Sequence, residues 1–217
     1  MLTKEDLLTQ NTIPLLKETS LELYKEFSEN ILIPTTFLYY FTDGTTMTIQ
    51  FVEWGIYHLL GIQHIDYTIK KNTLFDKIDK GLTYNTFKND SSINKRFRTM
   101  KKRICMFSCI YDTLKKGHVF YLPSGKVKNT KNVCADFIIY QKLQSSTDGI
   151  SGMNVGIRKV DDIYVPLTNL ISPASDLTMY IDEGRFKLVQ KLEILNADGD
   201  VVEAMSYAPA IITKDTQ

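Results

Sequence analysis

From His118 onward, apolar residues alternate with polar ones, and this alternation constrains the fold more than any other feature of the 217-residue chain. The segments HVFYL, CADFIIYQKL, MNVGIRKV and IYVPLTNLI show the period of two that is typical of strands. Their connections are too short to hold a crossover helix, so we expect an antiparallel meander. A last hairpin is expected where RFKLVQKLEIL leads through residues 196–199 to VVEAMSY.

The first half of the chain combines one hairpin with several helices. The pair Asp43-Gly44 separates TTFLYYF from TMTIQFV and suits a tight hairpin turn. Helical spacing resumes in EWGIYHLL and stops at Gly61, which can adopt the left-handed conformation that ends a helix. Apolar spacing predicts an acidic amphipathic helix or helix pair over residues 5–30, interrupted at Pro14. Further helices are expected over 70–80, closed by Gly81, over 83–88 and over 92–115.

The middle of the chain is strongly basic, although the whole chain is nearly neutral. Residues 68–142 contain 17 Lys and Arg against 5 Asp and Glu, and the other residues contain 9 against 20, which leaves a net charge of +1. Such a field attracts polyanions and weakens with salt, so nucleic acid is the first partner to consider. Two alternatives stay open: the basic residues keep a surface solvated, or acidic flanks fold back over the basic segment.

The helix expected over 92–115 carries both the apolar stripe and much of this charge. At 100° per residue, Lys95, Arg98 and Lys102 fall on the solvated side, whereas Arg96 and Arg103 share one margin of the stripe. On such a margin a charged head can enter a cleft while its stem packs. The stripe consists of Ile93, Phe97, Met100, Ile104, Phe107, Tyr111 and Leu114.

Only three histidines are present, His58, His64 and His118, so imidazole chemistry near neutral pH has few candidates. His58 follows Trp54 by four residues on one helical face, where it is either a satisfied core histidine or a proton-transfer group. The histidines do not pair at helical spacing and acids are sparse in the basic segment, so no metal site is predicted.

The three cysteines, Cys105, Cys109 and Cys134, fit free buried thiols in a reducing cytoplasm better than a disulfide framework. Cys105 and Cys109 have helical spacing but no second pair of metal ligands nearby. No stretch approaches the ~18 apolar residues of a membrane span, and no membrane contact is expected.

Asp136 lies inside the apolar strand CADFIIY, where alternation puts it on the face opposite Phe137. Burial of a carboxylate without a partner is costly, so we expect an arginine or a loop hydrogen bond to satisfy it. A structural and a catalytic role both stay open for this residue.

A basic segment with histidine suits one reaction that needs no metal or other cofactor, the attack of a ribose 2′-hydroxyl on the adjacent phosphodiester. This reaction needs a base for the hydroxyl proton, cations for the charge on the phosphate, and an acid for the leaving oxygen. Side chains alone can supply all three.

The order of these features resembles a family of nucleases. The segments FVEWGIYHLLGIQHI, LFDKIDKGLTYNTFKNDSSINKRF, RTMKKRICMFSCIYDTL, KVKNTKNVCADFIIYQKL and MNVGIRKVDDIYVPLTNLIS are similar to the fourth type of phage barnase/EndoU/colicin/RelE-like nuclease domains. The resemblance covers residues 35–195. It rests most on HLLGI, on the helix that bears Arg103 and on the pair Asp136-Phe137.

This resemblance implies an α+β fold with helices packed on an antiparallel β-sheet. It also implies a metal-independent ribonuclease of phage or prophage origin, acting as a toxin or effector in the cytoplasm of a bacterial host. His58 is then the matching acid or base, Arg103 the candidate phosphate clamp and Asp136 a candidate orienting group. The chain divides accordingly into an N-terminal helical cap over 1–34, a nuclease-like domain over 35–195, and a C-terminal hairpin and tail over 196–217.

Our leading hypothesis is an RNA-directed nuclease that holds phosphate in a groove between the 92–115 helix and the sheet, with an antitoxin or immunity protein as a further partner. The expected nucleic-acid contacts are Arg96, Arg98, Lys102, Lys128 and Lys131, the last two on a loop over 126–131. One alternative is a non-catalytic phage-encoded inhibitor that binds nucleic acid or a nucleic-acid enzyme through the same basic face. Another is a protein whose acidic ends and basic middle pair between subunits.

Overall fold

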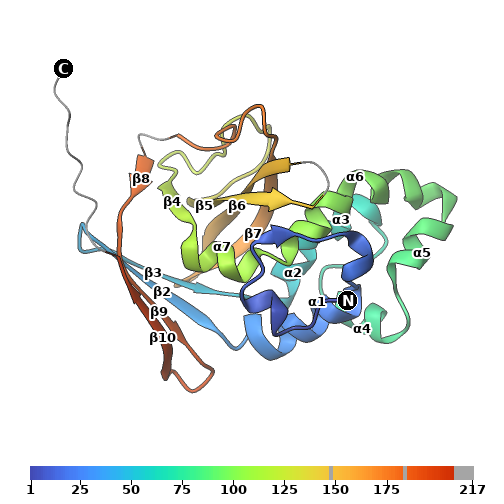
Figure 1. Ribbon diagram of the computed structural model, residues 1–217, viewed down its shortest axis with the longest axis horizontal. Helices are drawn as coiled ribbons and strands as arrows, with labels where there is room; N and C mark the ends of the chain where they lie inside the picture. Colours follow the sequence, from blue (N-terminus) through green and yellow to red (C-terminus); the bar gives the residue numbers. More distant parts are fainter. Residues whose placement is uncertain (147–148, 183–184, 208–217) are drawn as a thin grey trace.

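The computed structural model describes residues 1–146, 149–182 and 185–207. Within these residues, strands and helices occur in comparable amounts, and the strands form a single curled sheet (Figure 1). The predicted α+β class is therefore confirmed. Residues 208–217 of the expected C-terminal tail lie outside the described part of the chain.

The sheet has the strand order β10-β9-β2-β3-β7-β6-β5-β4-β8, and β1 pairs with β5 beside this path. The strands are β1 (Thr12–Ile13), β2 (Thr36–Phe41), β3 (Thr46–Gln50), β4 (His118–Tyr121), β5 (Phe137–Ser145), β6 (Gly149–Val160), β7 (Ile163–Ser172), β8 (Phe186–Lys187), β9 (Val189–Leu195) and β10 (Val201–Ser206). The backbone N–H of Thr42, after β2, donates to the carbonyl of Leu188, between β8 and β9. Because β8 closes one end of the strand order and β9 lies near the other, the curl brings the two ends of the sheet together.

Most of the predicted pairings are confirmed. Strands β4 to β7 form an antiparallel meander, β2 and β3 form a hairpin with Gly44 at φ +81°, and β9 and β10 form the last hairpin. The sheet is nevertheless mixed, because β1 runs parallel to β5 and β3 runs parallel to β7. A parallel pair needs a long connection, and the chain between β3 and β7 supplies one with six helices, α2 to α7, followed by strands β4 to β6.

Seven α-helices lie within the described residues, most of them at one end of the sheet (Figure 1). They are α1 (Leu21–Phe27), α2 (Glu53–Leu60), α3 (Ile62–Ile65), α4 (Leu74–Asp79), α5 (Tyr84–Asn89), α6 (Ser91–Phe107) and α7 (Ile110–Lys116). The helix predicted over 70–80 begins only at Leu74, since the N–H and hydroxyl of Thr73 both bond the carbonyl of Lys70 and form a turn before it.

The acidic helix predicted over 5–30 is not confirmed. This stretch contains two short 3₁₀ turns, Asp6–Leu8 and Leu16–Glu18, followed by α1 and a π-helical turn, Ser28–Leu32. Pro14 cannot donate a helical hydrogen bond, and the hydroxyl of Ser20 caps a new helix by accepting from the N–H of Leu23.

The single helix predicted over 92–115 is wrong, because the structure divides it into α6 and α7. Ser108 donates its hydroxyl proton to the carbonyl of Cys105, and the N–H groups of Ser108 and Cys109 bond carbonyls three residues back, which tightens and ends α6. The apolar stripe continues across the break: Phe97 and Leu114 are both fully buried.

Helix α7 lies in the hollow of the curled sheet (Figure 1). The ring of Tyr111 packs edge to face on Phe37 of β2, and the hydroxyl of Tyr39 donates to the carbonyl of Leu114. The principal core joins these helices to the concave face of the sheet. A smaller apolar cluster, which includes Phe120, Ile138 and Ile181, packs outside it.

Candidate functional site

Helix α2 presents Trp54 and His58, four residues apart, on a half-buried side. Its other side is buried against the core and consists of Ile56, Leu59 and Leu60. Gly61 ends α2 with φ +72°, as the sequence predicted, and the chain turns at once into α3. This turn brings His64 of α3, which is exposed, close to the end of α2.

Arg103 lies buried against the end of α2. Its Nε donates to the carbonyl of Leu59 at 3.1 Å, and Nη2 donates to the carbonyl of His58. Such bonds satisfy the last carbonyls of a helix and place a cation at its negative end. Burial lowers the pKa of Arg103 to about 10, so the guanidinium stays charged at neutral pH. A Cβ at Gly61 would lie 3.1 Å from the Arg103 side chain, so Gly61 also makes room for the contact.

Arg96 makes the equivalent contact with α3. Its Nε donates to the carbonyl of Ile65 at 2.9 Å, and its guanidinium lies 4.9 Å from the ring centroid of Tyr67. The two arginines predicted to share one margin of the helix therefore both hold the α2–α3 segment on α6.

His58 is half-buried and is not sealed in the core. Its ring lies edge to face with Trp54 and Tyr57, at centroid distances of 6.2 and 5.2 Å. Burial lowers the pKa of His58 below its ordinary value, and the positive charges of Lys71, Arg103 and His64 lower it further. Partial burial and the charge of Arg103 also lower the pKa of His64. We call His58, His64, Lys71 and Arg103 the histidine cluster.

Lys71 reaches this cluster from the loop that follows α3. Its Nζ lies 5.1 Å from the ring centroid of Trp54, and the hydroxyl of Tyr57 fastens the same loop by donating to the carbonyl of Ile69 at 2.9 Å. The sequence does not predict this contact of Lys71, because no pattern within residues 66–73 indicates which aromatic ring the amine approaches.

Asp136 is not brought to the histidine cluster. It precedes β5, and its Oδ2 accepts the backbone N–H of Lys159 at 2.7 Å. Its own N–H donates to the carbonyl of Ile157, and its carbonyl accepts from Leu122. Of the two partners expected for this carboxylate, the structure therefore provides a backbone donor instead of an arginine.

Lys128 and Lys131 are exposed on the loop between β4 and β5. The loop is tied down by buried Val127, whose N–H donates to the carbonyl of Val133, and by Asn129, whose amide donates to the carbonyl of Met179. Helix α2 packs on β7, and β4 is three strands away from β7 in the sheet order.

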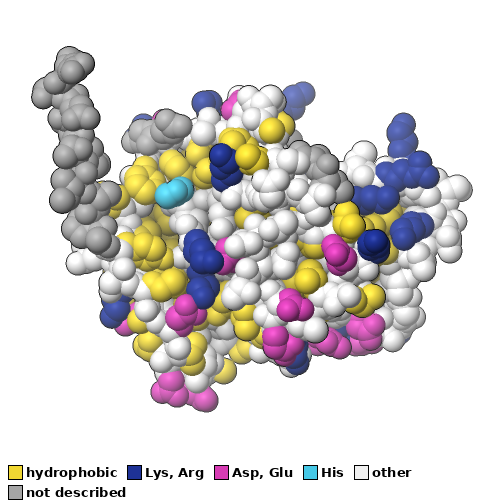
Figure 2. Space-filling view, viewed as in Figure 1, with side chains coloured by type: hydrophobic (Ala, Val, Ile, Leu, Met, Phe, Trp, Pro, Cys, Tyr) yellow, Lys and Arg dark blue, Asp and Glu magenta, His cyan; other side chains and the backbone are white. Residues whose placement is uncertain are grey.

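The remaining predicted contacts belong to a basic surface over α5 and α6, where Lys and Arg side chains gather at the right of the view (Figure 2). Lys88, Lys95 and Arg98 are exposed there, and Lys102 is half-buried. Apart from Lys102, no Lys or Arg of residues 70–103 pairs with a carboxylate of the described residues. The basic surface is therefore open to an anion from solution.

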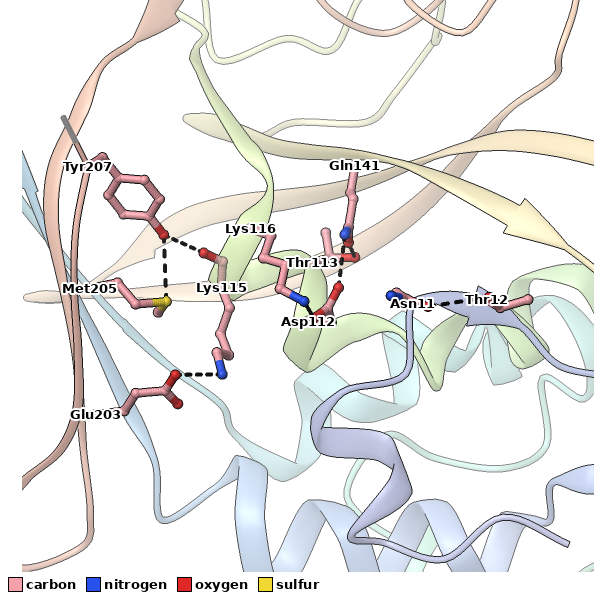
Figure 3. A network of polar contacts seen from close by, with 10 residues as sticks. All are labelled: Asn11, Thr12, Asp112, Thr113, Lys115, Lys116, Gln141, Glu203, Met205 and Tyr207. Carbon is pink, nitrogen blue, oxygen red and sulfur yellow. Dashed lines mark hydrogen bonds and ion pairs between the residues drawn. The ribbon is translucent and has the colours of Figure 1, made fainter. Parts of the chain in front are cut away.

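The lysines around α7 differ, because each has a carboxylate partner (Figure 3). Lys115 lies 2.7 Å from Glu203 of β10, and Lys116 lies 2.5 Å from the buried Asp112. Asp112 also accepts a bond from Gln141 of β5 at 2.9 Å. The Lys115–Glu203 pair fastens α7 to β10 and the bond from Gln141 fastens it to β5, whereas the Lys116–Asp112 pair lies within the helix.

Two cavities are lined by other residues that the sequence analysis named, and neither is lined by the histidine cluster. One of about 210 Å³ lies between α6 and strands β1 and β5, where Lys101, Lys102 and Cys105 contribute to its wall. Another, of about 300 Å³, is lined by His118, Phe186 and Tyr207. The first cavity lies between the long helix and the sheet, as the predicted groove does, but neither His58 nor Arg103 lines it.

Within residues 1–146, 149–182 and 185–207, no three His, Cys, Asp or Glu side chains gather in a way that could hold a metal ion. Cys105 and Cys109 are buried free thiols, as predicted, but the prediction is wrong for Cys134, which is exposed before β5. A helix of the length and apolar character needed to span a membrane is likewise absent from these residues.

Residues 21–179 match the family model described as phage-Barnase-EndoU-ColicinE5/D-RelE like nuclease4, which is well over half of the chain. The chain belongs to this nuclease family. The resemblance predicted from the sequence is thereby confirmed, and membership supports a nuclease function and a nucleic-acid substrate. The matched segment contains the histidine cluster, the basic surface and the meander. No curated protein and no solved structure gives a significant match.

Proposed function

We propose that this chain cleaves RNA by attack of a ribose 2′-hydroxyl on the adjacent phosphodiester, without a metal, at the histidine cluster. The observation that carries the proposal is that two cations, Lys71 and Arg103, lie close to the helix end that bears His58 and leads into His64. Neither cation pairs with a carboxylate of the described residues. Imidazoles supply the proton transfers that this reaction needs, and the cations offset the charge that develops on the phosphate.

His58 is the proposed base. Its lowered pKa keeps it neutral at pH 7, so it can accept the 2′-hydroxyl proton as the oxygen attacks phosphorus. His64 is the proposed acid, since a bound phosphate raises the pKa of a neighbouring imidazole and keeps it protonated. The P–O bond to the 5′ oxygen breaks as that oxygen takes the proton from His64. The products are a 2′,3′-cyclic phosphate and a free 5′-hydroxyl.

Arg103 is a positioning residue in this proposal, because its bonds to the carbonyls of His58 and Leu59 fix the end of α2. Lys71 lies beside His58 and is the proposed phosphate contact. Arg96, Arg98 and Lys102 extend the positive field along α6.

Lys128 and Lys131 are proposed contacts for RNA that extends beyond the cut. Asp136 enters the proposal as a structural group, because its carboxylate accepts the N–H of Lys159. The phage or prophage origin, the role as a toxin or effector in the cytoplasm of a bacterial host, and a neutralising antitoxin or immunity protein also belong to the proposal. The family description, which names phage, colicin and RelE-like nucleases, supports them.

The test incubates purified protein with matched RNA and DNA oligonucleotides, each with and without excess chelator. We expect RNA to be cut with or without chelator, DNA to stay intact, and the RNA fragments to carry 2′,3′-cyclic phosphate ends. Loss of cutting in chelator would contradict the metal-independent mechanism. RNA binding without any cutting would favour the non-catalytic inhibitor.

A further inference from the structure

Tyr67 is the most exposed aromatic side chain among the described residues, at 75% of its surface. It follows α3 directly and lies three residues beyond His64. Tyrosine is enriched at binding interfaces because its ring offers an apolar face and its hydroxyl a polar end, so an exposed tyrosine beside cations is a candidate contact.

One face of the Tyr67 ring is already occupied. The guanidinium of Arg96 lies 4.9 Å from the ring centroid, and the bond from Arg96 to the carbonyl of Ile65 fixes that guanidinium in place. Tyr67 makes no contact with another ring and its hydroxyl has no partner, within the part of the chain that the structure describes.

The backbone that carries the ring is ordered by local hydrogen bonds. The backbone N–H and the hydroxyl of Thr68 both donate to Oδ1 of Asp66, at 2.9 and 2.7 Å. These bonds hold Tyr67, which lies between the two residues, in a turn. A platform held in this way loses little conformational freedom when a ligand stacks on it.

A second ring in the site has the same arrangement. Trp54 is half-buried beside His58, and the amine of Lys71 lies 5.1 Å from its centroid. An aromatic ring with a cation over it therefore lies on each side of the two histidines, Trp54 on the α2 side and Tyr67 on the α3 side. Exposed aromatic residues elsewhere differ, since Tyr121 packs on Phe137 at 5.3 Å and Phe186 packs on Phe120 at 5.5 Å.

We propose that Tyr67, with Arg96 behind it, is a stacking platform for an unpaired base next to the phosphate held by the histidine cluster, so that the substrate is single-stranded RNA. The inference rests on the proposed RNA site and adds its substrate class. A base inside a duplex is stacked on both sides and cannot lie on a protein ring, whereas an unpaired base can. Trp54 is the second, more enclosed ring of the same site.

The test measures binding by fluorescence anisotropy with a short, fully 2′-O-methylated RNA. This probe has no 2′-hydroxyl to attack, so the result does not depend on catalysis. The RNA is used as a single strand and annealed to its complement. The proteins are the wild type, Tyr67→Ala, Tyr67→Phe and the control Tyr121→Ala, each with a thermal melt to show that it is folded.

Tyr67→Ala should weaken single-strand binding about 5- to 100-fold, the range measured for loss of one stacked base. Tyr67→Phe and Tyr121→Ala should retain the wild-type affinity, and binding of the annealed duplex should be weaker and insensitive to Tyr67→Ala. Unchanged single-strand binding by Tyr67→Ala, or a preference for duplex, would overturn the inference even if RNA is cut. If Tyr67→Ala weakens single-strand binding but the wild-type protein does not cut natural RNA, the result would support the stacking platform and contradict the nuclease chemistry.

Discussion

The helical end of the molecule and the α7 side of the sheet both present lysines, aromatic rings and histidine, but they use their charges differently. Cations lie over aromatic rings in both regions, but at the helical end the cations around His58 and His64 have no carboxylate partner in the described residues. Around α7 and β9, the carboxylates of Glu203, Asp112, Asp43 and Glu193 each pair with a lysine.

The difference separates charge that stabilises the fold from charge that can bind a ligand. An ion pair joins α7 to β10 and a hydrogen bond from Gln141 joins it to β5, so the charges of Lys115 and Asp112 are used within the fold (Figure 3). At the helical end the field is not neutralised by the described residues, so a phosphate backbone can complete it. Whether a lysine has a carboxylate partner therefore says more about its function than where it lies in the basic segment.

The histidines of the two regions should differ most in their effect on cleavage. His58→Gln should lower the rate of RNA cleavage about 100- to 10,000-fold, the usual contribution of a general base. His118→Gln changes an exposed histidine at the start of β4 and should leave the rate nearly unchanged. Single-turnover cleavage measures both, and equal losses would remove the distinction between the regions.

Arg103→Met should destabilise the fold by about 2–4 kcal/mol, because it removes charged hydrogen bonds to two helix-end carbonyls. Arg98→Met, an exposed change on the same helix, should stay within about 0.5 kcal/mol. Urea unfolding of both variants gives the comparison. A stable Arg103→Met protein that has lost RNA binding would instead favour the direct phosphate clamp predicted from the resemblance.

The salt dependence of RNA binding should distinguish open cations from paired ones. Replacing Lys95 and Arg98 by alanine should reduce the slope of log K against log salt by up to ~1.4, since each single-strand phosphate contact contributes about 0.7. Replacing Lys187 and Lys191, which pair with Asp43 and Glu193, should leave the slope unchanged. Anisotropy titrations at several salt concentrations measure it, and a larger change in the second variant would reverse the comparison.

Stability at acid pH should change least. The pKa values of His58 and His64 lie below 6.5 in the folded protein, so the unfolded chain binds more protons between those values and 6.5. Their contribution to stability is full above about pH 6.5 and is lost as the pH falls through the folded-state pKa values. Melting curves from pH 7.5 to 5 should fall less steeply for the variant with His58→Gln and His64→Gln, and an unchanged profile would contradict the lowered pKa values.

Elements with local signals could be predicted from the sequence. The turn at Asp43-Gly44 and the end of α2 at Gly61 depend on conformations that glycine adopts easily, and both are confirmed. The meander followed from alternation and short connections. The break at Ser108 was missed because a serine hydroxyl that bonds its own helix has no clear signature in a continuous apolar stripe.

The candidate site depended more on tertiary contacts. Spacing correctly put Arg96 and Arg103 on one side of α6, but the helix ends that they hold are set by how α2 and α3 pack there. The approach of Lys71 to Trp54 and the partner of Asp136 likewise join segments far apart in the sequence. The parallel pairing of β3 with β7 was missed for the same reason.

If the helical end is the binding region, RNA must lie on its unpaired cations. The most direct test is to photo-crosslink the wild-type protein to a short single-stranded 2′-O-methyl RNA that carries 4-thiouridine. Mass spectrometry of the linked peptides then locates the RNA on the protein. We expect crosslinks within residues 54–71 and 95–103. Crosslinks confined to His118, Tyr121 and Phe186 would show that RNA binds at the α7 side of the sheet instead.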